Sequence, residues 1–290
     1  MTRKPVFAVI GGSGLYGMPD LEDVETHQVD TPFGLPSSPI IIGSLAGRRV
    51  AFLARHGEGH ILSPSEINYR ANIYALKAIG VERIVSVSAC GSLRDDYEPG
   101  HIVIPDQLFD FTKDRKRSFF TDGLVAHVPV ADPFCRDLSA IVVEATRTTG
   151  KRVHSGGTFI TIEGPRFSTR GESHTFRSWG MSIIGMTTSP EAFLAKEAEL
   201  CYAVMAHVTD YDVWHAGEEA VTADLVFKTV VANLEAAQDA LRNLAANFPT
   251  ERDCDCDSTL STSLSTHPDK ISPETRKRLG LLVDKYFTEN

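Results

Sequence analysis

The feature of this sequence that most constrains its fold is an apolar run that leads directly into a cluster of glycines. Residues 5–10 read Pro-Val-Phe-Ala-Val-Ile, and residues 11–17 read Gly-Gly-Ser-Gly-Leu-Tyr-Gly. We therefore predict a buried strand followed by a tight turn. Because glycine adopts backbone conformations that other residues avoid, the N–H groups of this turn and the Ser13 hydroxyl can converge on one anion.

The same glycines match the G-x-G-x-x-G spacing of dinucleotide-binding turns at Gly12, Gly14 and Gly17, although such a triplet is often only a turn. Dinucleotide binding requires a helix directly after the glycines and an acidic residue at the end of the next strand. Here Pro19 follows at once, and residues 31–39 contain three prolines where helix and strand should be. The sequence thus argues against a nicotinamide-dependent oxidoreductase. A mononucleotide, a sugar phosphate or free phosphate stays open as the ligand.

Length and composition allow one large globular α/β domain or two small ones. The chain has 290 residues, of which 42% are hydrophobic and 23% charged, as is ordinary for a globular protein. Its net charge is −9, and the only basic cluster is residues 113–117, which we interpret as a solvated loop. Nucleic acid is therefore not expected as a partner. Since no run of a membrane span's length and no signal peptide stands out, we expect a cytoplasmic protein without a membrane partner.

Apolar runs typical of buried strands alternate with segments of helical periodicity over residues 1–248. We predict strands at residues 5–10, 39–43, 49–54, 83–88, 102–104, 158–162, 182–186 and 202–209, and helices at residues 65–79, 133–149, 190–199 and 222–248. This alternation predicts one α/β domain with a central mixed sheet flanked by helices. Residues 249–290 are a separate C-terminal tail, in which a loose polar excursion over 249–268 precedes a helical pattern over 273–287.

The five cysteines are scattered, and the only close pair is Cys254-Asp255-Cys256. We expect reduced thiols, because an odd number argues against a complete disulfide framework. The C-x-C pair is not interpreted as a zinc site, since no second cysteine or histidine pair stands at ligand spacing along the sequence.

Polar side chains follow five of the predicted strands. They include Arg55, His56 and His60 after residues 49–54, Ser92 after 83–88, Arg166 and Ser168 after 158–162, Thr187 after 182–186, and Asp210 and Asp212 after 202–209. Because ligands of open α/β sheets bind outside the strand ends, we expect one shared pocket. The alternative is that these residues only cap turns and helices.

The hydroxyl, imidazole and guanidinium groups of this set suit a phosphate ion. They belong to Ser13, Arg55, His56, Ser88 and Thr187. No Walker lysine and no cluster of metal ligands accompanies them in the sequence, which favours orthophosphate as a substrate over triphosphate hydrolysis. The carboxylates of Asp210 and Asp212 need a partner that carries hydrogen. A 6-aminopurine supplies one through its exocyclic amino group and through a ring N7 that gains a proton as the base leaves.

Seven short segments carry a resemblance to a known family; in chain order they read GGSGL, DTPFG, ARHG, SACGSL, TIEGPRFS, MTTSPE and TDYD. This set resembles the trimeric purine nucleoside phosphorylase superfamily over about residues 6–248, and within it the 5′-methylthioadenosine phosphorylases. TIEGPRFSTR together with MTTSPE is highly specific, whereas the glycine loop alone is not. The resemblance implies a mixed, partly barrel-like sheet and a homotrimer or a homohexamer built as a dimer of trimers.

The activity implied by the resemblance is phosphorolysis of methylthioadenosine to adenine and 5-methylthioribose 1-phosphate, in purine and methionine salvage. Orthophosphate is a co-substrate, and no cofactor or metal is implied. As the leaving group departs from an oxocarbenium-like sugar, Asp210 acts as the acid that shares a proton with N7.

The resemblance also implies roles for individual residues. The phosphate site would contain Ser13, Arg55, His56, Ser88 and Thr187, and the purine and ribose pocket would contain Ala89, Phe167 and Met186. The catalytic acids that read the purine would be Asp210 and Asp212. The 5′-methylthio pocket would contain His127, Ala223 and Val226, with His127 from a neighbouring subunit. Ser13 stands where threonine is common, Gly185 replaces a polar residue of some relatives, and the small Ala223 leaves tolerance of larger 5′ groups open. Some heat-stable relatives carry a C-x-C and internal disulfides, which implies an oxidised Cys135–Cys201 pair as the alternative to reduced thiols.

Two further readings stay open beside the oxidoreductase. A purine nucleoside phosphorylase acting on methylthioinosine, inosine or guanosine is the nearer, but such 6-oxopurine enzymes carry asparagine where Asp210 stands, so Asp210 favours adenine. A non-catalytic nucleoside-binding protein is the other, and the intact acid and phosphate positions argue against it.

Overall fold

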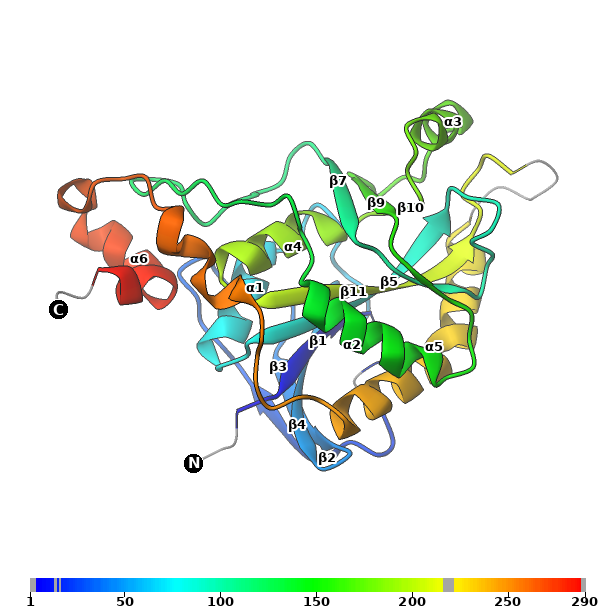
Figure 1. Ribbon diagram of the computed structural model, residues 1–290, viewed down its shortest axis with the longest axis horizontal. Helices are drawn as coiled ribbons and strands as arrows, with labels where there is room; N and C mark the ends of the chain where they lie inside the picture. Colours follow the sequence, from blue (N-terminus) through cyan, green and yellow to red (C-terminus); the bar gives the residue numbers. More distant parts are fainter. Residues whose placement is uncertain (1–3, 13–14, 16, 216–221, 288–290) are drawn as a thin grey trace.

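Eleven strands form one mixed sheet in the part of the chain that the structure, a computed structural model, describes: residues 4–12, 15, 17–215 and 222–287 (Figure 1). The strands are β1 (Phe7–Gly11), β2 (Glu22–His27), β3 (Ile40–Leu45), β4 (Arg48–Ala54), β5 (Arg83–Ser92), β6 (Ile102–Ile104), β7 (Gln107–Phe111), β8 (Val153–Ser155), β9 (Thr158–Ile162), β10 (Ile183–Gly185) and β11 (Cys201–Asp210). The helices are α1 (Tyr69–Ala78), α2 (Arg136–Arg147), α3 (Arg170–Ser178), α4 (Thr188–Glu197), α5 (Ala223–Ala246) and α6 (Pro273–Val283), with 3-10 turns η1 (Asp255–Thr262), η2 (Pro268–Lys270) and η3 (Asp284–Tyr286).

The sheet branches at β5, which has three neighbouring strands. Its first part pairs in parallel with β1, nearly its whole length pairs in parallel with β11, and its last residues pair antiparallel with β10. One path of strands runs β2-β3-β4-β1-β5-β10-β9-β7, while β11, β6 and β8 form a side branch. The strands β4, β1 and β11 run parallel to one another and to β5. Their C-terminal ends therefore lie at the same edge of the sheet, beside β5.

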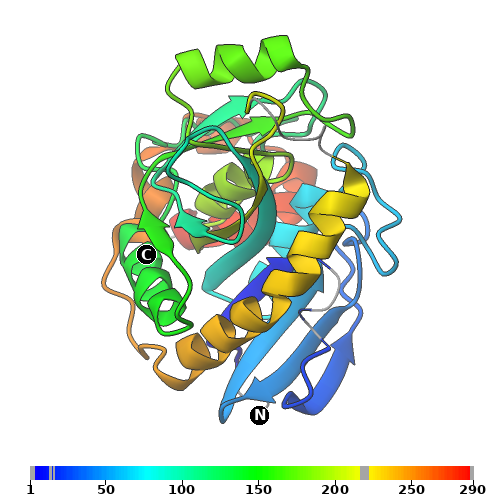
Figure 2. The same ribbon diagram turned by 90° about the vertical axis from the view of Figure 1, so that its right-hand side faces the viewer.

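The side chains of β11 alternate between two apolar cores, one on each face of the sheet. Those of Tyr202, Val204, Ala206 and Val208 pack into the core that contains α1 and α4, whereas those of Cys201, Ala203 and Met205 pack into the core that contains α2 and α5. Figures 1 and 2 show α2 and α5 lying together across one face. A strand covered on both faces is apolar at most positions, which explains why residues 202–209 read as a nearly continuous apolar run.

All strands and helices predicted from the sequence are present, with bounds that differ by a few residues, and the mixed α/β class is confirmed. The structure adds β2, β7, β8 and α3. β2 lies at the edge of the sheet with mostly exposed, charged side chains, so it lacks an apolar signal. α3 buries only Ser173 and Phe176, but a capping box between Thr169 and Glu172 marks its start and was available in the sequence.

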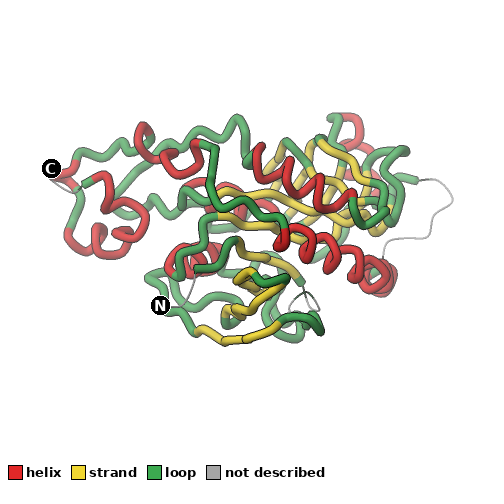
Figure 3. The backbone as a smooth tube through the Cα atoms, turned by 60° about the horizontal axis from the view of Figure 1, so that its bottom comes forward, coloured by secondary structure: helices red, strands yellow, loops and turns green. Residues whose placement is uncertain are grey.

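The C-terminal segment is packed against the rest of the protein, and the expectation of a loose excursion over residues 249–268 is wrong. Leu260 and Leu279 are fully buried, and Cys256 is 7% exposed. The backbone N–H of His127 donates to the carbonyl of Ser263, which joins this segment to the loop after β7. Figures 1 and 3 show the C-terminal segment at one end of the molecule. The polar composition hid this packing, because a few buried residues stand among many exposed ones. The division of the chain at residue 248 stays a prediction.

Among the described residues, no helix combines the length and the apolar character that crossing a membrane would demand.

Candidate active site

The ends of β1 and β4 lie side by side, next to β5. Gly11 pairs with Ala54, and the backbone N–H of Arg55 donates to the carbonyl of Gly11 at 3.0 Å. The residues that follow β1 and β4 therefore begin at the same edge, and Ser88 of β5 lies along it. Ser13, the first predicted phosphate ligand, lies outside the described residues.

The guanidinium of Arg55 is turned into the protein rather than toward solvent. Arg55 is 2% exposed, and its Nε and Nη2 donate to the two carboxylate oxygens of Glu191 at 2.7 and 2.8 Å. Nη2 also donates to Ser86 Oγ at 2.6 Å, and Nη1 donates to the carbonyl of Val87 at 3.3 Å. We expected this planar fork to bind phosphate through two hydrogen bonds, but that two-point contact is made to Glu191. Arg55 thus fastens α4 to β5.

The ion pair also places the start of α4 at the same edge, because Glu191 lies in the first turn of that helix. Thr187 stands at the N-cap position and is 7% exposed, yet its side chain makes no capping hydrogen bond. The buried hydroxyl of Ser88 has no hydrogen-bond partner among the described residues. A buried polar group without a partner costs about 1–3 kcal/mol, so a bound anion that accepts from these hydroxyls would recover that loss. The helix N-terminus favours negative charge in the same place.

His56 is held as a neutral ring beside this edge. Its Nδ1 donates to the carbonyl of Leu62 at 2.8 Å, and the ring stacks on His60 with centroids 4.2 Å apart. Burial lowers the pKa of His56 to about 4, and the nearby charge of Arg55 acts in the same direction. At neutral pH His56 therefore offers hydrogen bonding, not a positive charge, to an anion.

The second group of predicted residues gathers at the end of β11. Asp210 pairs with Gly91 of β5, and a side chain at position 91 would place its Cβ 2.9 Å from Asp210 Oδ1. Asp210 Oδ2 accepts from the Thr209 hydroxyl at 2.6 Å, and Oδ1 accepts from the backbone N–H of Asp212 at 2.7 Å. The latter bond closes a turn in which Asp212 has φ 51°, a conformation that aspartate tolerates. Glycine at position 91 leaves the room that this carboxyl needs.

Burial makes both carboxyl groups easier to protonate than in water. It raises the pKa of Asp210 to about 6, with the charge of Asp212 acting in the same direction and the hydrogen bond from Thr209 opposing it. Burial also raises the pKa of Asp212, while the hydroxyls of Ser173 and Ser168 lower it. A buried carboxyl that holds a proton near neutral pH is suited to general acid catalysis.

Arg115 holds together the loops beside this carboxyl pair, a role that the sequence did not predict. Its side chain is 1% exposed, and Nη1 donates to the carbonyls of Met186 and Ser189 at 2.7 and 2.6 Å. Nη2 donates to the carbonyl of Glu163 at 2.7 Å, so one side chain joins the loop after β9 to the loop after β10. The interpretation of residues 113–117 as a solvated loop is wrong for Arg115 alone, because its four neighbours in that run are exposed. The charge pattern gives no sign of which of them turns inward.

The predicted substrate residues fall into two groups. Ala89 lies on β5 between Ser88 and Gly91, which are three residues or about 10 Å apart along the strand. Phe167 follows β9 and is 36% exposed, and Met186 follows β10 and is half-buried. The residues assigned to the 5′ pocket lie on other segments: His127 is exposed on the loop that contacts the C-terminal segment, Ala223 is exposed at the start of α5, and Val226 is half-buried one turn later.

Known proteins resemble this chain in sequence and in fold. A family model described as the phosphorylase superfamily matches residues 6–248. The chain belongs to the phosphorylase superfamily. Among its relatives in this superfamily is an S-methyl-5′-thioadenosine phosphorylase of Chloroflexus aurantiacus, 52% identical over 287 residues, which covers 99% of this chain and 100% of the relative. The protein of that name from Koribacter versatilis is 50% identical over 281 residues, with coverage of 97% and 96%.

Solved structures of the phosphorylase superfamily share the fold. A methylthioadenosine phosphorylase from an Antarctic soil metagenomic library has a TM-score of 0.90 and 45% identity, covering 97% of this chain and 99% of that chain. The methylthioadenosine phosphorylase from Schistosoma mansoni in complex with adenine has a TM-score of 0.85 and 35% identity, with coverage of 92% and 100%. The family and the fold expected from the sequence are thereby confirmed.

The ion pair at the site predicts a stability effect. Arg55→Ala leaves Glu191 buried without its partner, and breaking such a pair costs about 3–5 kcal/mol. We expect urea denaturation to show a loss of that size in the free energy of unfolding. As a control, Arg136→Ala removes an exposed pair with Asp132 and should leave stability nearly unchanged. An Arg55→Ala protein as stable as the wild type would show that the pair does not fasten α4.

The pKa of Asp210 predicts how stability varies with pH. Because the folded pKa of about 6 lies above the ordinary value of 3.8, the folded protein retains a proton that the unfolded chain has already released in this interval. The free energy of unfolding should therefore fall as pH rises from 4 to 7, by about 2 kcal/mol from this group. Asp210→Asn should remove that decrease, whereas the exposed control Asp269→Asn should retain it. Identical pH profiles of urea midpoints for Asp210→Asn and the wild type would contradict the shift.

Proposed function

We propose that this protein cleaves S-methyl-5′-thioadenosine with orthophosphate, giving adenine and 5-methylthioribose 1-phosphate. The observation that carries the proposal is the pairing of two subsites along β5. Ser88, whose buried hydroxyl has no partner among the described residues, and Gly91, which pairs with Asp210, are three residues or about 10 Å apart along β5, so an anion and a base can be held at the two positions with the ribose between them. Relatives about half identical to this chain are named S-methyl-5′-thioadenosine phosphorylases, which supports the same substrate here.

The chemistry follows from where the groups stand. As the C1′–N9 bond breaks, positive charge develops on the ribose and electron density gathers on the purine. Asp210 supplies a proton to N7, and its other carboxyl oxygen accepts a hydrogen bond from the 6-amino group, with Asp212 beside it. An oxygen of the bound phosphate then forms the new bond to C1′. In this reaction Arg55 is a positioning residue, since its guanidinium is committed to Glu191.

The reaction needs no metal or organic cofactor, because the proton comes from Asp210 and the nucleophile is phosphate itself. We further propose a cytoplasmic enzyme of purine and methionine salvage that assembles as a homotrimer or a dimer of trimers. The exposed position of His127, on a loop other than the ones that carry Asp210 and Thr187, supports its contribution to a neighbouring subunit's 5′ pocket.

The experiment that tests the function is base release with and without phosphate. Adenine should form from methylthioadenosine only when orthophosphate is present, because phosphate is the nucleophile. Liquid chromatography measures adenine and the sugar product. Adenine release at a comparable rate in phosphate-free buffer would identify a hydrolase instead, and no release under either condition would leave a nucleoside-binding protein.

A phosphorylase of 6-oxopurine nucleosides is the second candidate, and Asp210 separates the two. A carboxylate repels a 6-oxo oxygen, whereas an amide donates to it. Asp210→Asn should lower kcat/KM on methylthioadenosine by orders of magnitude, since the proton donor is lost, and should raise the relative activity on methylthioinosine. Asp212→Asn, the matched control, should lose less, because Asp210 still protonates N7. If Asp210→Asn keeps the full preference for the 6-amino substrate, Asp210 does not read the base.

A further inference from the structure

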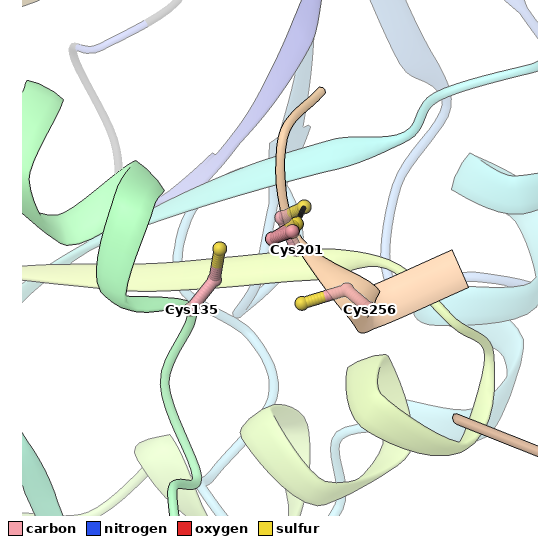
Figure 4. A group of neighbouring side chains, drawn as sticks. Cys135, Cys201 and Cys256 are labelled. Atoms are coloured by element: carbon pink, nitrogen blue, oxygen red, sulfur yellow. Dashed lines mark hydrogen bonds between the residues drawn. The ribbon is translucent and has the colours of Figure 1, made fainter. Parts of the chain in front are cut away.

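Four cysteines from three separate segments meet at the start of β11. Cys135 directly precedes α2, Cys201 opens β11, and Cys254 and Cys256 stand at the start of η1. Their four sulfur atoms all lie within 4.8 Å of one another, and the Sγ atoms of Cys201 and Cys254 are 3.3 Å apart. Figure 4 shows the side chains of Cys135, Cys201 and Cys256 converging from these segments. All five cysteines of the chain are described, and none forms a disulfide in the structure, so the Cys135–Cys201 bond allowed by the resemblance is not present.

This geometry suits one soft metal ion. In a tetrahedral zinc–thiolate site the Zn–S distance is about 2.3 Å, which places the sulfurs about 3.8 Å from one another. The 3.3 Å between Cys201 and Cys254 and the upper limit of 4.8 Å for all pairs bracket that value. Four thiolate ligands in a tetrahedron are typical of Zn²⁺ or of an iron–sulfur centre, and four protein ligands leave no open position for a substrate.

We propose that Cys135, Cys201, Cys254 and Cys256 bind one Zn²⁺ in a closed structural site. Binding forms four Zn–S bonds and releases the four thiol protons to solvent, so no oxidant or reductant takes part. The C-x-C pair alone does not predict a metal site, because no second pair stands nearby in the sequence. The fold supplies that pair from distant segments.

The surroundings of the sulfurs fit such a site. A Zn²⁺ ion with four thiolates carries a net charge of −2, which calls for compensating donors. The guanidinium of Arg252 interacts with the Cys201 sulfur and pairs with Asp257 at 3.0 Å. Cys135 stands at the N-cap position of α2, where the helix favours negative charge. Donors of this kind orient and stabilise the thiolates of metal sites.

The position of the cluster indicates a structural role. Cys201 and Asp210 stand at opposite ends of β11, about 30 Å apart along an extended strand. A metal at Cys201 therefore does not touch the proposed reacting atoms. It would instead fasten the C-terminal segment to β11 and α2, next to the buried Leu260. The proposal is thus independent of which reaction the protein catalyses.

The first test uses the wild-type protein, purified without a metal-binding tag, under reducing conditions and without added metal. We expect elemental analysis to find about one zinc per chain. Reconstitution of the metal-free protein with Co²⁺ should give the visible bands and the near-ultraviolet sulfur-to-metal band of a tetrahedral thiolate site. Iron in place of zinc, or a wild-type protein that binds neither Zn²⁺ nor Co²⁺ when reduced, would overturn the proposal. So would intact mass spectrometry of the unreduced protein that shows these four cysteines joined in disulfides.

The second test uses matched variants. Cys254→Ser removes the least buried ligand and should lower the bound zinc several-fold, whereas Cys90→Ala removes a buried cysteine outside the cluster and should keep about one zinc per chain. Removal of zinc from the wild type should lower Tm while room-temperature turnover is retained. Equal zinc content in the two variants would place the metal elsewhere and overturn the assignment, and the wild-type measurements decide the matter should Cys254→Ser fail to fold.

Discussion

The buried ion pair between Arg55 and Glu191 is the interaction on which the site depends. Two charges removed from water are tolerated only when each satisfies the other, so the geometry of the pair is closely constrained. Arg55 also donates to Ser86 and to the carbonyls of Ile10 and Val87, and Glu191 accepts from the Tyr202 hydroxyl. These contacts hold five parts of the fold in fixed positions: the ends of β1 and β4, the middle of β5, the start of β11 and the first turn of α4.

The electrostatic character of the site follows from these pairings. Arg55 is neutralised by Glu191, and His56 is an uncharged ring at neutral pH because burial holds its pKa at about 4. In the proposed reaction the phosphate would therefore be held by hydroxyls, backbone N–H groups and the helix terminus rather than by free positive charge. On the other side, burial of Asp210 favours the protonated carboxyl. In the proposed reaction this balance would let a dianionic substrate and two carboxyl groups share one site in a chain whose net charge is −9.

The parts of the fold that the sequence predicted well are those where burial dictates composition. β11 and β5 lie between two cores, so their apolar runs are typical of buried strands and predict them directly. Edge elements such as β2 and α3 carry polar residues and left too weak a signal. Inward-turned charges were harder still: nothing local distinguishes Arg115 from its exposed neighbours in a charged run, and nothing in the sequence around Arg55 reveals that Glu191 occupies its fork. The cysteine cluster was hidden for a related reason, because its members come together only through long-range packing.

The pairing of β5 with β11 has a consequence for how the chain folds during synthesis. Arg83 pairs with Cys201, so the strand that completes the centre of the sheet is made long after the strand that awaits it. Until β11 leaves the ribosome, one edge of β5 is open and both apolar cores lack the strand they share. Such late, non-local pairing slows folding and exposes apolar surface to neighbouring chains. The nascent protein thus exposes the open edge of β5 while its first strands are already made, and that edge is the surface at which neighbouring chains can pair.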